Sequence, residues 1–108
     1  MKENAKLQVT ILGLGYNGLP TAALIASKGI TVHGVDVNRT VVDTINKGKI
    51  HIVEPDLEGL VHFAVRKGTL VASQKVRPSD VFLLAVPTPF KKNHQPDLSF
   101  VEKATRML

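Results

Sequence analysis

The chain has 108 residues and a formal net charge of +5, with 44% hydrophobic and 21% charged residues, as expected for one globular domain. It contains no cysteine, which excludes disulfide bonds and thiol chemistry within these residues. The Lys and Arg residues are scattered, and one Tyr and four Phe offer little stacking surface, so we expect no nucleic-acid partner. Residues 1–6 are polar with no signal segment after them, and the longest apolar run, residues 81–86, is too short to span a bilayer. We therefore expect a cytoplasmic protein without membrane contact.

The first predicted strand, residues 7–13, runs into the motif G-x-G-x-x-G, formed by Gly13, Gly15 and Gly18. A predicted helix follows over residues 16–28, and Pro20 suits its first turn, where N–H groups have no partner within the helix. The next predicted strand, residues 31–36, ends on the carboxylate of Asp36. A motif between strand and helix, with an acid at the end of the next strand, predicts a dinucleotide site.

Each residue of this motif has an expected role. Gly13 makes the tight turn, Gly15 lets the backbone approach a pyrophosphate, and Gly18 lets the helix pack close to the strand. Asp36 is expected to accept hydrogen bonds from the ribose hydroxyls and to repel a 2′-phosphate, which favours NAD over NADP. Arg39 complicates this choice, since an arginine can also hold a 2′-phosphate, but we expect it to flank the adenine.

The rest of the chain continues the alternation of strands and helices. We predict helices over residues 39–47 and from Pro55 to Lys67, then strands over residues 69–72 and 81–86. The continuous apolar run of the last strand suggests burial on both faces of a parallel sheet. A final helix, capped by Asp97, would present residues 101, 104, 105 and 108. The pattern predicts an α/β fold, a Rossmann-type doubly wound parallel sheet with strand order 3-2-1-4, truncated within the last helix.

Pro87 and Thr88 follow the last predicted strand. Ligands in this fold bind beyond the carboxyl ends of the strands, so we expect this rigid loop to bring the Thr88 hydroxyl near the cofactor. The histidines and carboxylates lack the spacing of metal ligands, so no metal is expected. His33 and His62 are interpreted as structural or surface residues.

Several segments resemble the UDP-glucose/GDP-mannose dehydrogenase family: residues 13–23 with the glycine motif, residues 34–38 around Asp36, and residues 86–89 around Thr88. Residues 50–57, 85–90 and 96–102 resemble the members that oxidise UDP-N-acetyl-D-mannosamine. The resemblance implies that Gly13, Gly15, Tyr16, Asn17, Gly18, Asp36 and Thr88 contact NAD, although the family usually has Val or Ile where Asn17 stands.

The resemblance also implies a reaction, the oxidation of the C6 alcohol of a nucleotide sugar to a carboxylate with two NAD. The family's catalytic cysteine would lie beyond Leu108, so residues 1–108 would be an incomplete N-terminal NAD-binding Rossmann domain without catalytic residues. The central helix, the substrate domain and the UDP-sugar pocket would follow, and the full-length protein would be a homodimer or higher homo-oligomer. Two alternatives remain open: another UDP-sugar such as UDP-glucose as substrate, or a regulatory nucleotide-sensing Rossmann domain of the potassium-channel type.

Overall fold

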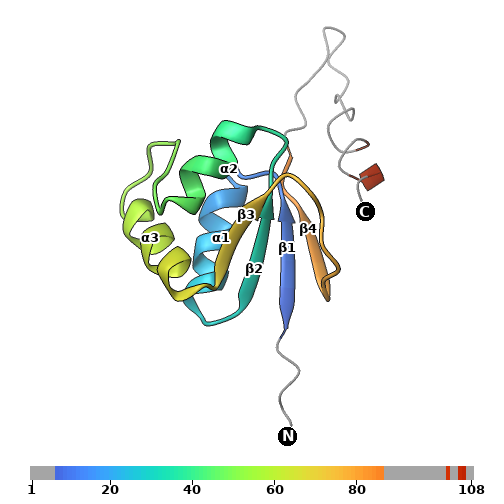
Figure 1. The fold of residues 1–108 in the computed structure, drawn as a ribbon, viewed down its shortest axis with the longest axis horizontal. Helices are drawn as coiled ribbons and strands as arrows, with labels where there is room; N and C mark the ends of the chain where they lie inside the picture. Colours follow the sequence, from blue (N-terminus) through green and yellow to red (C-terminus); the bar gives the residue numbers. More distant parts are fainter. Residues whose placement is uncertain (1–6, 87–101, 103–104, 107–108) are drawn as a thin grey trace, which may run out of the picture.

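The computed structural model describes residues 7–86, 102 and 105–106, and its centre is a four-stranded parallel sheet. The strands lie in the order β3-β2-β1-β4 (Figure 1), which confirms the predicted order. Their bounds are β1 Gln8–Leu12, β2 Thr31–Val35, β3 Leu70–Ser73 and β4 Val81–Leu84. Three helices connect the first three strands: α1 Gly18–Ser27, α2 Arg39–Asn46 and α3 Leu57–Lys67.

The helices end where the sequence predicts. Gly29, Gly48 and Gly68 follow α1, α2 and α3 with φ values of +89°, +76° and +81°, a conformation that glycine adopts without strain and that ends a helix. The start of α3 differs from the prediction. Pro55 lies in a turn before the helix, because Asp56 takes a φ of +64° and the helix begins only at Leu57.

The main core lies between the helices and one face of the sheet. It contains the strand residues that point toward the helices, such as Val9, Ile11 and Val32, each no more than 4% exposed. Three alanines of α1 are also buried there, Ala22, Ala23 and Ala26. These small side chains let α1 lie close to the sheet.

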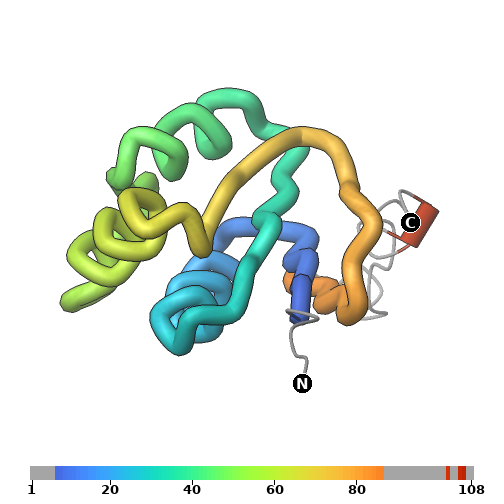
Figure 2. The backbone as a smooth tube through the Cα atoms, turned by 60° about the horizontal axis from the view of Figure 1, so that its bottom comes forward, coloured from blue at the N-terminus to red at the C-terminus, as the bar shows by residue number. Residues whose placement is uncertain are grey.

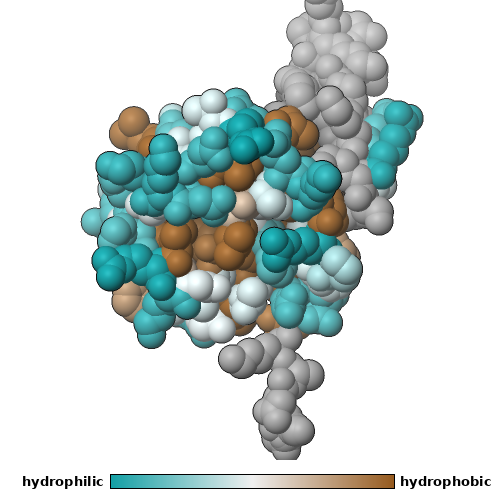
Figure 3. Space-filling model, in the orientation of Figure 1, coloured by the Kyte–Doolittle hydropathy of each residue, from teal (hydrophilic) through white to brown (hydrophobic). Residues whose placement is uncertain are grey.

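The opposite face is crossed by the segment that leaves β3 and returns to β4, residues 74–80. Figure 2 shows it on the other side of β2 from α1. Val76 packs against Leu12 and Val35, and the hydroxyls of Thr10 and Ser79 are hydrogen-bonded. This segment covers only part of the face. In the view of Figure 3, apolar side chains are exposed near the centre of the molecule and are bordered by hydrophilic ones.

β4 is more exposed than its apolar sequence predicts. Its residues Val81, Phe82, Leu83 and Leu84 are 37–44% exposed, because β4 is an edge strand and the three helices gather over β1, β2 and β3. The prediction of burial on both faces is therefore wrong for the described chain. Of the last predicted helix, Glu102, Thr105 and Arg106 are helical, while Asp97 and the rest of its apolar face lie outside the described residues.

Candidate functional site

The glycine-rich turn lies at the edge of the sheet where the parallel strands end. Gly13 has a φ of +98°, and a Cβ atom at this position would lie 2.6 Å from the carbonyl oxygen of Ala85. Its N–H donates to the carbonyl of Val35 at 2.7 Å. A side chain here would strain the backbone and collide with Ala85, directly after β4, so the turn requires glycine, as predicted.

The space around Gly18 is filled by neighbouring atoms, whereas the space around Gly15 is open. A Cβ on Gly18 would overlap the carbonyl oxygen of Gly13, so the packing role predicted for Gly18 is confirmed. A Cβ on Gly15 would meet no heavy atom within 4 Å. The space beside Gly15 is therefore open to a ligand, which is the condition for its predicted contact with a pyrophosphate.

The N-terminus of α1 offers unpaired donors. Within the described chain, the backbone N–H groups of residues 15–18 donate no hydrogen bond. Asn17 occupies the N-cap position without a side-chain cap bond, and the first turn contains no acidic residue. Tyr16 is 64% exposed. In contrast, the Asn38 side chain caps α2 by accepting from the N–H groups of Thr40 and Val41. Of these two helix starts, α1 has the free donors and positive dipole end that suit phosphates.

Asp36 lies directly after β2, and its carboxylate holds the turn in place. Oδ2 accepts from the N–H of Leu14 at 2.9 Å, and Oδ1 accepts from the N–H of Asn38 at 3.0 Å. Each carboxylate oxygen has further lone pairs, so these bonds leave acceptors for ribose hydroxyls. The structural role of Asp36 was not predicted, although its bond to Asn38, two residues on, is a common local pattern for aspartate.

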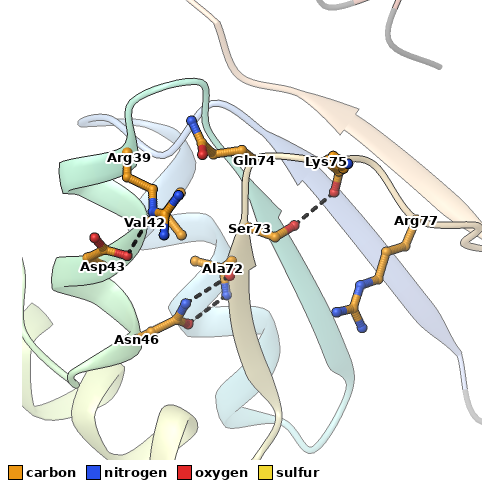
Figure 4. A pocket seen from close by; sticks show the side chains of 9 residues that line it. All are labelled: Arg39, Val42, Asp43, Asn46, Ala72, Ser73, Gln74, Lys75 and Arg77. Atoms are coloured by element: carbon orange, nitrogen blue, oxygen red, sulfur yellow. Dashed lines mark hydrogen bonds and ion pairs between the residues drawn. The ribbon is translucent and has the colours of Figure 1, made fainter.

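Arg39 begins α2, and its Nε atom lies 3.4 Å from Oδ1 of Asp43, one helical turn further on. Arg39 also lines an open pocket of about 510 Å³, shared with Gln74, Lys75 and Arg77 from the segment after β3 (Figure 4). Lys75 and Arg77 were not singled out from the sequence, because only the path of this segment brings them to the pocket lining.

The sequence also raised the loop after β4, metal binding and membrane spanning as questions. Pro87 and Thr88 lie outside the described residues. The described chain after β4 passes beside Gly13, and there the N–H of Ala85 donates to the carbonyl of Leu12 at 2.8 Å. In the described ranges, no three His, Cys, Asp or Glu residues converge to hold a metal ion. Nor does any described helix have the length and apolar character to cross a membrane.

His33 is buried, as a structural histidine would be, whereas His62 is exposed. The Nε2–H of His33 faces Oε1 of Gln8 at 3.2 Å, while Nδ1 is buried without a hydrogen-bond partner. Burial, and to a smaller extent the charge of Arg77, lower the pKa of His33 below its ordinary value of 6.5. His33 is therefore neutral near pH 7 and belongs to the sheet rather than to the turn.

The geometry agrees with comparisons to known proteins. Two curated relatives match nearly all of the chain. The NDP-N-acetyl-D-galactosaminuronic acid dehydrogenase of Ralstonia nicotianae is 56% identical over 100 residues, which are 93% of this chain and 24% of the relative. The UDP-N-acetyl-D-mannosamine dehydrogenase of Campylobacter jejuni is 54% identical over 102 residues, 94% of this chain and 25% of the relative. The chain thus spans about a quarter of the length of these relatives.

Solved structures show the same fold. The UDP-N-acetyl-mannosamine dehydrogenase of Staphylococcus aureus superimposes with a TM-score of 0.90 at 38% identity, over 93% of this chain and 25% of that one. A GDP-mannose dehydrogenase from Pseudomonas aeruginosa, solved as a ternary complex, gives a TM-score of 0.88 at 41% identity. The match covers 92% of this chain and 24% of that one. Residues 7–108 match the model described as UDP-glucose/GDP-mannose dehydrogenase family, NAD binding domain. The chain therefore belongs to the UDP-glucose/GDP-mannose dehydrogenase family, as part of its NAD-binding domain.

Proposed function

We propose that the chain binds NAD across the C-terminal edge of the sheet, with the pyrophosphate at the N-terminus of α1 and the adenosine ribose at Asp36. The free N–H groups of residues 15–18 carry this proposal, because they are oriented donors at the positive end of a helix. The open space beside Gly15 supports it. Bound NAD supplies a hydride acceptor, while residues of this chain hold and orient it.

The remaining contacts follow from where the chain runs. Tyr16 and Asn17 are exposed beside the free N–H groups, so we assign them contacts with the pyrophosphate side of NAD. Pro87 and Thr88 follow the exit of β4, and we assign them to the nicotinamide side, as the resemblance implies. Arg39 lies on the adenosine side, next to the pocket between α2 and residues 74–77.

For the complete protein, we propose a UDP-N-acetyl-D-mannosamine 6-dehydrogenase. It would oxidise the C6 alcohol of the sugar to a carboxylate, a loss of four electrons taken up by two NAD, and so supply precursors for surface polysaccharides. The 54% identity to relatives of that name supports this substrate. The 56% identity to an NDP-N-acetyl-D-galactosaminuronic acid dehydrogenase supports another nucleotide sugar as a second candidate.

The architecture of the complete protein is also a proposal. We propose that a central helix and a substrate domain follow this N-terminal domain, and that they contribute the catalytic cysteine and the UDP-sugar pocket. The greater length of the relatives supports this arrangement. A cytoplasmic homodimer or higher homo-oligomer is the assembly that the family resemblance implies.

Cofactor binding is tested by calorimetry of the chain with NAD and with NADP. We expect tighter binding of NAD, because the Asp36 carboxylate, assigned here to the ribose hydroxyls, would repel a 2′-phosphate. The Asp36→Ser variant is expected to narrow the difference between the two dissociation constants. Equal or tighter binding of NADP by the unchanged chain would contradict the assignment of Asp36.

Turnover is tested by absorbance at the NADH band. The chain has no cysteine and so cannot form the thioester that the family reaction requires. We therefore expect it to bind NAD without reducing it in the presence of any UDP-sugar. The full-length protein that contains it is expected to form two NADH per UDP-N-acetyl-D-mannosamine. Turnover by the chain alone would show that the active site has been misplaced.

A further inference from the structure

The pocket between α2 and the segment after β3 directly adjoins Asp36. The N–H of Asp36 donates to the carbonyl of Ser73, which lines the pocket, at 3.1 Å. The side-chain Nε2 of Gln74, also in the pocket wall, donates to the carbonyl of Val37 at 2.8 Å. The pocket therefore lies next to the segment of chain that carries Asp36, to which the proposed function assigns the ribose.

The positive charges that line the pocket would attract a 2′-phosphate, whereas Asp36 predicts a preference for NAD, which has none. Its walls carry three cations, Arg39, Lys75 and Arg77, against a single acid, Asp43. Arginine binds phosphate well because its planar guanidinium offers several donors in a fixed geometry. Such a pocket would favour a 2′-phosphate unless something restrains its cations.

Asp43 is the group that restrains Arg39. Its Oδ1 atom lies 3.4 Å from Nε of Arg39, across one turn of α2. In Figure 4 the Arg39 side chain runs along the helix toward Asp43. The carboxylate also adds a negative charge to the pocket wall, and like charges repel a phosphate.

We propose that Asp43 is a positioning residue for cofactor choice, which favours NAD over NADP by holding Arg39 along α2 and by adding its negative charge to the pocket. This inference rests on the proposed function, the binding of NAD. Asp36 acts at the ribose itself, whereas Asp43 acts one helical turn away, through Arg39.

The test compares the ratio of the dissociation constants for NADP and NAD by calorimetry of the chain. An exposed ion pair one turn apart contributes about 0.2–0.5 kcal/mol, so the Asp43→Asn variant is expected to shift the ratio toward NADP by about 1.4- to 2.3-fold. Asp43→Glu restores a carboxylate and should return the ratio toward that of the unchanged chain. The double variant Arg39→Gln/Asp43→Asn should lose most of this shift toward NADP, because it has no Arg39 guanidinium to bind the 2′-phosphate.

Glu58→Gln is the matched control, because it removes one exposed negative charge from α3 instead of α2. It should leave the ratio unchanged, whereas an equal shift in this variant would mean that only net charge matters. A merely structural role of Asp43 would change both dissociation constants together, so an unchanged ratio in Asp43→Asn overturns the proposal. If the unchanged chain binds neither cofactor, the proposed function itself fails. Normal NAD binding with an unchanged ratio refutes only the role of Asp43.

Discussion

At the scale of single residues, the glycines of one motif have different physical roles. Gly13 and Gly18 are required by the fold, since a Cβ on either would collide with backbone atoms of the turn or of the β4 exit. Gly15 meets nothing within 4 Å and is required only if a ligand approaches. The motif therefore combines two structural positions with one that a ligand alone would explain.

A pair of alanine variants separates these roles. Gly18→Ala is expected to lower the free energy of unfolding by about 1–3 kcal/mol or more, because the added methyl overlaps the Gly13 carbonyl. Gly15→Ala is expected to keep nearly the unchanged stability and to weaken NAD binding. Urea unfolding and calorimetry measure the two quantities. Equal losses of stability in both variants would contradict the distinction.

At the scale of elements, the segment of residues 74–80 joins two parts of the molecule. It contributes Gln74, Lys75 and Arg77 to the pocket beside Asp36. On the open face of the sheet, its Ser79 is hydrogen-bonded to Thr10, and the charge of Arg77 acts on His33. Asp80, at its end, accepts from the N–H of Gln8 at 2.8 Å. The pocket wall and the cover of the sheet are thus one stretch of chain.

The buried His33 makes stability depend on pH. Its pKa is lowered in the folded state, first by burial and then by Arg77, so the unfolded chain binds more protons at mildly acidic pH. The contribution of His33 to the free energy of unfolding is expected to be constant above the unfolded pKa of about 6.5 and to fall as the pH drops below it. Asp80, the acid of this segment, is already engaged with the backbone of Gln8.

Urea unfolding between pH 5 and 8 checks this expectation. Between about pH 5 and 6.5, the free energy of unfolding of the His33→Gln variant should depend much less on pH. The carboxylates contribute little to this dependence in that range. The His62→Gln variant is the control, since His62 is exposed on α3. A slope unaffected by His33→Gln would assign the pH dependence to other groups.

At the scale of the whole molecule, the described sheet has an apolar edge. Val81, Phe82, Leu83 and Leu84 are 37–44% exposed on an edge strand. Exposed edge strands with apolar side chains tend to pair with other chains. We expect the 108-residue chain to self-associate, and Leu83→Lys to weaken this association by placing a charge on the edge. Light scattering over a range of concentrations measures it, and a monomer at all concentrations would refute the expectation.

The sequence by itself determined the order of elements, the strand order, the helix ends at Gly29, Gly48 and Gly68, and the glycine turn before α1. These features depend on local backbone preferences and on apolar periodicity, which neighbouring residues express directly. The family resemblance also came from contiguous segments. The starts of helices were less accurate, because the φ of Asp56 is not encoded in a helical pattern.

Only the tertiary structure decided which distant groups meet. The bond from Leu14 to Asp36 joins residues 22 positions apart, and the charge of Arg77 that lowers the pKa of His33 comes from the segment that crosses the sheet. The pocket beside Asp36 likewise joins α2 to residues that follow β3. Strand register and the path of the β3–β4 connection set these contacts, and neither leaves a local pattern in the sequence. The exposure of β4 has the same origin, since an apolar run indicates what can be buried but not which element covers it.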